Sequence, residues 1–129
     1  MSADRPPRAS IRVLFAVGLP QIRDMLRHAL VTDGRFDVSD VSDGPATVEA
    51  ALATQPDVVV LDLGLPHFEG ASAVARIVRE CPHTKVVVLS GVVEMGAEVL
   101  RAGAHSFFET TAPAHELPAA IAELVARDN

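Results

Sequence analysis

Cysteine and the larger aromatic residues are almost absent from this chain. It has one cysteine, no tryptophan, no tyrosine and five phenylalanines among 129 residues. A single cysteine, Cys81, excludes a disulfide framework and a thiolate metal site built by this chain alone. No apolar run approaches the roughly 20 residues that a membrane-spanning helix needs, and residues 1–10 are polar with two prolines, unlike a signal peptide. We therefore expect a cytoplasmic protein that is disordered over residues 1–10.

Basic residues are in the minority. The chain has 11 lysines and arginines against 17 aspartates and glutamates, which gives a formal net charge of −6. Nucleic-acid binding needs a concentrated basic face, so direct binding of DNA or RNA by this segment is not expected. Neither G-x-G-x-x-G nor G-x-x-x-x-G-K-[ST] follows the first apolar segment, so no nucleotide-binding loop is indicated. The length fits one domain, which we place at residues 11–129.

Apolar segments alternate with amphipathic ones along the chain. Strands are predicted for five segments: Ile11–Val17, Phe36–Val41, Val58–Asp62, Lys85–Ser90 and His105–Glu109. The third and fourth are apolar throughout their interior, which is typical of strands buried on both faces of a parallel sheet. The second alternates apolar and polar residues, as an edge strand does.

Helices are predicted after each strand. The first opens at Pro20 and ends at Asp33-Gly34, and the second follows Asp43-Gly44-Pro45 and closes before Pro56. The third carries Val74, Ile77 and Val78 and ends at Cys81-Pro82, and the fourth spans Glu94–Ala102. The fifth begins close to Pro118 and carries the apolar residues Leu117, Ile121, Leu124 and Val125 on one face. Five alternations predict an α/β fold: a five-stranded parallel sheet of order 2-1-3-4-5, doubly wound with five helices.

Asp62 is the first candidate functional residue. It ends an apolar strand and precedes a loop that contains Gly64 and Pro66. In open parallel sheets the binding crevice lies at the carboxyl ends of the strands, so Asp62 is a candidate reactive carboxylate. The alternative is a turn or capping aspartate, and spacing alone does not separate the two.

These segments together resemble the receiver (CheY-like) domain of bacterial response regulators, most closely the branch with LuxR-type helix-turn-helix output domains. The resemblance rests on Asp57–Pro66 with Glu69-Gly70, on Val86–Gly91, on Arg101–Ala104 followed by Phe107, and on Ile11–Leu14 with Pro20 and Arg23. It implies a flavodoxin-like fold and a role in two-component phosphorelay signal transduction. In that family the residue matching Asp62 accepts a phosphoryl group, and those matching Ser90 and Phe107 form the conformational switch.

Two parts of the family's phosphoryl-transfer site are missing. The acidic pair that holds Mg²⁺ after the first strand matches Val17 and Gly18, and no Asp or Glu occurs from Ile11 to Arg23 that a shift in register could supply. The family's lysine after the fifth strand matches Thr110. Because Mg²⁺ needs oxygen ligands and phosphoryl transfer depends on electrostatic stabilisation, we expect an atypical pseudo-receiver that is not an enzyme, binds no Mg²⁺ and has no cofactor.

Other residues support weaker interpretations. The histidines lie on different elements, and no two of them are paired at i, i+4. We therefore interpret them as solvated or capping residues. As an exception, His67 together with Phe68 could line a pocket beside Asp62. The five histidines are His28, His67, His83, His105 and His115. Cys81 is interpreted as a buried or half-buried apolar residue. Ser90-Gly91 lacks the G-x-S-x-G pattern of a hydrolase nucleophile.

Three functions stay open. We favour a regulatory module that acts on an attached output domain or a partner protein, controlling transcription in a bacterium. Its contact surface is predicted on the fourth helix, fifth strand and fifth helix. A buried Phe107 would keep this surface in a single conformation. A homodimer would form through the same surface. A conventional phosphoacceptor modified at Asp62 and a receiver-fold domain that binds a small apolar ligand are the alternatives.

Overall fold

Five parallel strands form the centre of the molecule. The computed structural model describes residues 10–41, 44–63, 70–90 and 96–127. The strands are β1 (Ile11–Ala16), β2 (Phe36–Val41), β3 (Val58–Asp62), β4 (Lys85–Ser90) and β5 (Ser106–Glu109), and they lie in the order β2-β1-β3-β4-β5. The predicted fold class and strand order are confirmed.

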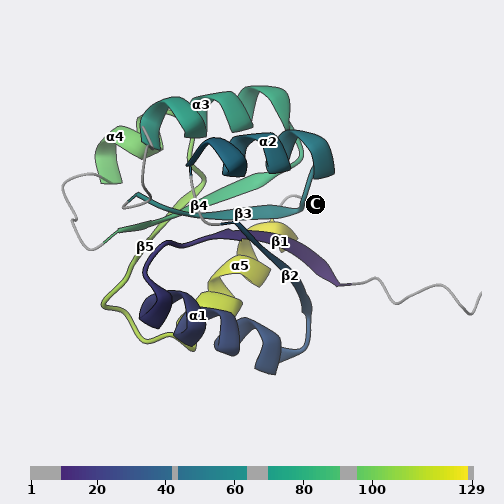
Figure 1. Ribbon diagram of the computed structural model, residues 1–129, viewed down its shortest axis with the longest axis vertical. Coiled ribbons are helices and arrows are strands. Elements are labelled where there is room, and N and C mark those ends of the chain that lie inside the picture. Colours follow the sequence, from purple (N-terminus) through teal and green to yellow (C-terminus); the bar gives the residue numbers. More distant parts are fainter. Residues whose placement is uncertain (1–9, 42–43, 64–69, 91–95, 128–129) are drawn as a thin grey trace, which may run out of the picture.

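Helices cover both faces of this sheet. They are α1 (Pro20–Asp33), α2 (Gly44–Thr54), α3 (Gly70–Glu80), α4 (Gly96–Arg101) and α5 (Glu116–Ala126). Helices α2, α3 and α4 lie on one face, and α1 and α5 lie on the other (Figure 1). Among the described residues, no helix is both long enough and apolar enough to cross a membrane.

The core has two parts, one on each face of the sheet. Successive side chains of a strand point to opposite faces, so β1 contributes Leu14 and Ala16 to the cluster under α2 and α3, and Val13 and Phe15 to the cluster under α1 and α5. Strand β3 divides in the same way and is fully buried from Val58 to Leu61. The continuous apolar runs are therefore explained by burial on both faces.

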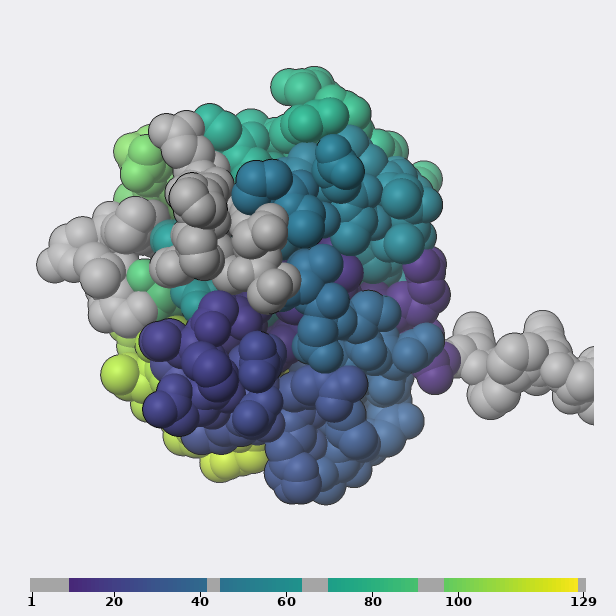
Figure 2. Space-filling view, in the orientation of Figure 1, coloured from purple at the N-terminus to yellow at the C-terminus, as the bar shows by residue number. Residues whose placement is uncertain are grey.

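Strand β2 is the half-exposed edge that its alternation predicts. Only Phe36 of this strand is buried. Helix α1 and β2 lie side by side on the face drawn in Figure 2, where Arg27 of α1 donates to Asp40 across 3.0 Å. Charged residues on an exposed strand also discourage pairing with another chain.

Local signals set most of the helix boundaries. Pro20 is the first residue of α1, and Gly34 follows its last turn with a φ of +90°, a left-handed conformation that glycine adopts without steric cost. Helix α5 begins at Glu116, two residues before Pro118, as predicted.

Several predicted boundaries differ from the structure by one or two residues. Strand β1 ends at Ala16 rather than Val17, β5 begins at Ser106 rather than His105, and α4 ends at Arg101 rather than Ala102. The predicted start of this helix at Glu94 lies outside the described residues. Some predictions lie outside the described residues: disorder before residue 10, and the pocket role of His67 and Phe68.

Candidate functional site

Asp62 lies where the central strand leaves the core. The four residues before it in β3 are buried, whereas Asp62 is half-buried. Its Cα pairs with Leu89 of β4, and the next residue, Leu63, donates its N–H to the Leu89 carbonyl across 3.1 Å. Asp62 therefore lies at the carboxyl ends of the strands, as its sequence position predicts.

Val17 and Gly18 directly follow β1, at the carboxyl end of that strand. Val17 is completely buried in the cluster under α1 and α5. The N–H of Gly18 donates to Oδ2 of Asp62 across 3.4 Å. A backbone donor thus points at the Asp62 carboxylate, and the neighbouring side chain is an apolar one that packs in the core.

Ser90 and Thr110 lie at the same edge of the sheet. Ser90 ends β4, one residue after the partner of Asp62, and is 6% exposed. Its carbonyl accepts the N–H of Thr110 across 3.1 Å. The structure therefore brings Val17, Gly18, Asp62, Ser90 and Thr110 to one end of the sheet.

Phe107 is half-buried rather than buried. Its ring packs against the cluster under α2 and α3. The next residue, Phe108, is buried with Leu117 in the cluster under α1 and α5, on the other face of the sheet. Strand β5 is an edge strand of the sheet. Phe107 therefore lies at the border of the core rather than within it.

The described residues do not fit a Mg²⁺ ion. In the parts of the chain that the structure describes, no three His, Cys, Asp or Glu side chains gather where they could hold a metal. Mg²⁺ prefers near-octahedral oxygen ligands, usually with one or two carboxylates among them. Asp62 supplies one carboxylate, but a neighbouring N–H points at it, and Val17 offers no oxygen from its side chain.

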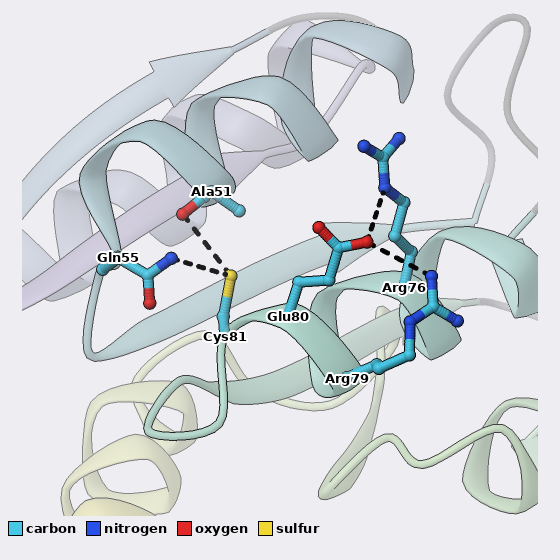
Figure 3. Close-up of polar contacts among 6 residues, drawn as sticks. All are labelled: Ala51, Gln55, Arg76, Arg79, Glu80 and Cys81. Carbon is cyan, nitrogen blue, oxygen red and sulfur yellow. Dashed lines mark hydrogen bonds and ion pairs between the residues drawn. The ribbon is translucent and has the colours of Figure 1, made fainter.

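Cys81 has a structural role. Its side chain is fully buried after α3, where Sγ accepts from Nε2 of Gln55 across 3.5 Å and lies 3.6 Å from the carbonyl of Ala51 (Figure 3). Burial raises the pKa of the Cys81 thiol above its ordinary value. A buried thiol with a raised pKa has little thiolate at neutral pH, so the interpretation as an apolar core residue is confirmed.

A surface hollow between α1 and β2 was not predicted from the sequence. It measures about 360 Å³, and its walls are Arg23, Asp24, Arg27, Asp40 and Val41. Two ion pairs neutralise these walls, with Arg27 on Asp40 at 3.0 Å and Arg23 on Asp24 at 3.4 Å. The four-residue spacing of the two arginines places them on one face of α1, which is the only signal the sequence offers.

Known proteins resemble this chain over most of its length. Residues 18–122 match the response regulator receiver domain. A protein-glutamate methylesterase/protein-glutamine glutaminase of Anaeromyxobacter dehalogenans is 36% identical over 108 residues, which are 82% of this chain and 30% of that protein. The "Probable transcriptional regulatory protein SgaR" of Hyphomicrobium methylovorum is 33% identical over 97 residues, which are 74% of this chain and 45% of that protein.

A solved structure agrees with these matches. The signal receiver domain of the response regulator NarL from Mycobacterium tuberculosis superposes with a TM-score of 0.82 and 27% sequence identity, and covers 91% of this chain and 97% of that one. This chain spans less than half the length of the two curated relatives, at 30% and 45%.

Proposed function

The chain belongs to the response regulator receiver domain family, and from this premise we propose that it is a pseudo-receiver, which signals without Mg²⁺-dependent phosphorylation of Asp62. The observation that supports this most is the Gly18 N–H that points at Oδ2 of Asp62 beside a fully buried Val17. Phosphoryl transfer from a phosphodonor needs cations around the spread negative charge of the transferring group. At this crevice Thr110 offers only a hydroxyl where the family has a lysine.

The proposed role is regulation of an output domain or partner protein, including control of transcription. One relative bears the name of a transcriptional regulator and another that of a methylesterase, and both are more than twice as long as the matched segment. The chain itself is proposed to have no catalytic activity and no cofactor.

We place the contact with that partner on α4, β5 and α5. Leu100 of α4 is 47% exposed although it is a large apolar residue, and Phe107 of β5 is half-buried nearby in the fold. Exposed charges of opposite sign stand on the two helices, Arg101 on α4 and Glu116 on α5. An apolar centre with complementary charges also suits a symmetric homodimer, in which each patch meets its copy.

The test is treatment with acetyl phosphate and Mg²⁺, followed by intact-mass measurement. The mass of the parent should stay unchanged. Its melting temperature should not rise when Mg²⁺ is added. For comparison, a metal that binds the folded state and is present at 100 times its dissociation constant would raise the free energy of unfolding by about 2.7 kcal/mol. The triple variant Val17→Asp, Gly18→Asp, Thr110→Lys is the positive control. A phosphoryl adduct on the parent that is lost in Asp62→Asn would favour the conventional phosphoacceptor instead.

A further inference from the structure

At the opposite end of the sheet, a histidine side chain takes part in strand pairing. His105 lies one residue before β5, and its backbone N–H donates to the carbonyl of Val86 in β4 across 2.8 Å. The N–H of Val86 in turn donates to Nδ1 of His105 across 3.0 Å. In a regular parallel ladder a backbone carbonyl would accept this second bond. Here the chain turns at Gly103, with a φ of +117°, and the imidazole supplies the acceptor.

This bond requires a neutral imidazole. Nδ1 accepts a hydrogen bond only when it carries no proton, so the proton of neutral His105 must reside on Nε2. In the protonated ring both nitrogens are donors, and Nδ1–H would face the Val86 N–H. Val86 is completely buried, and a buried N–H without an acceptor is unfavourable. Protonation therefore breaks the bond and leaves two donors opposed.

His105 is open to solvent, and charged residues lie on the elements that contact β5. The side chain is exposed, so it exchanges protons with solvent. Strand β5 contacts β4 and α4. The charged residues of these two elements are Lys85 on β4 and Glu98 and Arg101 on α4, two cations against one anion.

We propose that His105 is a proton-operated latch between β4 and β5. When it is neutral, it ties the start of β5 to the fully buried Val86. When it takes a proton from solvent at Nδ1, the Val86 bond is lost and the corner where α4 leads into β5 loosens. The effect on signalling rests on the proposed contact surface at α4, β5 and α5, whereas the latch itself does not depend on it.

Amide hydrogen exchange followed by NMR tests the latch. Protection factors are measured for the amides of Val86 and of Val59, which lies in the central strand. They remove the intrinsic pH dependence of exchange. The measurements are made at pH 7.5 and pH 5, a range in which ordinary histidines titrate. In the parent, protection of Val86 relative to Val59 should fall by up to about tenfold at the lower pH, the fold-change expected for one hydrogen bond.

Two substitutions at His105 separate the acceptor from its titration. His105→Asn keeps an acceptor oxygen at the position of Nδ1 and does not titrate, so its Val86 protection should be the same at both pH values. His105→Ala should give low protection at both. His83→Asn, which changes an exposed histidine in the turn before β4, should behave as the parent does.

An equal pH response in the parent and in His105→Asn would overturn the latch, whether or not the alanine variant folds. The same conclusion would follow from a proton on Nδ1 at pH 7.5, read from the ring nitrogen shifts. Neither measurement uses a partner or a phosphodonor, so failure here leaves the pseudo-receiver proposal standing, and phosphorylation of Asp62 would leave the latch standing.

Discussion

At the amino ends of the strands, polar side chains bond the main chain of neighbouring elements, whereas the residue that follows β1 at its carboxyl end, Val17, is apolar and fully buried. Oδ2 of Asp57 accepts the N–H of Arg12 across 2.8 Å, and Oγ1 of Thr84 donates to the carbonyl of Pro56 across 2.6 Å. The guanidinium of Arg12 also donates to the carbonyl of Thr54 at the end of α2, across 2.6 Å. These contacts join β1, β3 and α2 at one edge of the sheet.

The carboxyl ends are built differently. Val17 packs into the core, and Gly18, which lies just beyond β1, donates its N–H to Oδ2 of Asp62 across 3.4 Å. We therefore expect the short bonds of Thr84 and Asp57 at the amino ends to contribute more to fold stability than the long contact between Gly18 and Asp62.

The largest expected effect comes from returning carboxylates to the carboxyl ends. Val17→Asp with Gly18→Asp places a charge in a fully buried site, so the free energy of unfolding in metal-free buffer should fall by about 3 kcal/mol. Mg²⁺ should restore part of the loss. Urea unfolding with chelator and with Mg²⁺ measures both effects. Gly18→Asp alone, at a half-buried position, is the control and should cost much less; an unchanged double variant would mean that this edge is open to water.

Loss of a buried bond at the amino ends should come next in size. Thr84 is 2% exposed, and Thr84→Val leaves the carbonyl of Pro56 without its hydroxyl donor. We expect a loss of about 1 to 2 kcal/mol in chemical unfolding. The matched control is Thr32→Val, whose exposed hydroxyl lies 3.3 Å from His28 and should contribute little. Equal effects of the two substitutions would remove the distinction between buried and exposed threonines.

Asp57 and Asp62 allow the two edges to be compared on one strand. Asp57 immediately precedes β3 and Asp62 ends it. Asp57→Ala should lower the free energy of unfolding by about 1 kcal/mol because a bond to a charged acceptor is lost. In Asp62→Ala, loss of the contact with Gly18 should by itself account for less than about 0.5 kcal/mol, because that contact is long. A larger loss for Asp62 would reverse the comparison.

The smallest effect is a pH dependence where α1 ends, before β2. A hydrogen bond from Arg35 holds the pKa of Asp33 below its ordinary value. A carboxyl with a lowered pKa stabilises the fold above its unfolded-state value, and this contribution is lost as pH falls below about 4. Asp33→Asn should therefore cost about 0.5 kcal/mol at pH 7 and progressively less as the pH falls below about 4, measured by unfolding at each pH. A difference that does not shrink at low pH would point to a cause other than charge.

Elements with a strong periodic pattern could be predicted from the sequence. The apolar runs of β3 and β4 leave no other role for these segments than strands buried on both faces, and Pro20 and Gly34 mark α1 through backbone conformation alone. The placement of Asp62 at the strand ends follows from the same pattern. These predictions depend only on local sequence and on how parallel sheets pack.

Other features depend on neighbours that are distant in sequence. The bond from Gly18 to Asp62 requires the main chain of one loop to meet a side chain from another strand, and no residue pattern encodes it. Exposure of Phe107 depends on the place of β5 at the edge of the sheet, and the role of His105 depends on the direction of the turn at Gly103. Tertiary geometry decides all three.

The single thiol offers a native reporter for opening of one helix layer. Cys81 is the only cysteine of the chain, and it lies beside Ala51 and Gln55 of α2. A thiol reagent reaches it only when α2 and α3 separate from the sheet, because the side chain is fully buried. The labelling rate under native conditions therefore gives the free energy of that opening, provided that reclosing is faster than labelling. No engineered probe is needed, and the opposite layer of α1 and α5 does not contribute to the signal unless the whole domain unfolds.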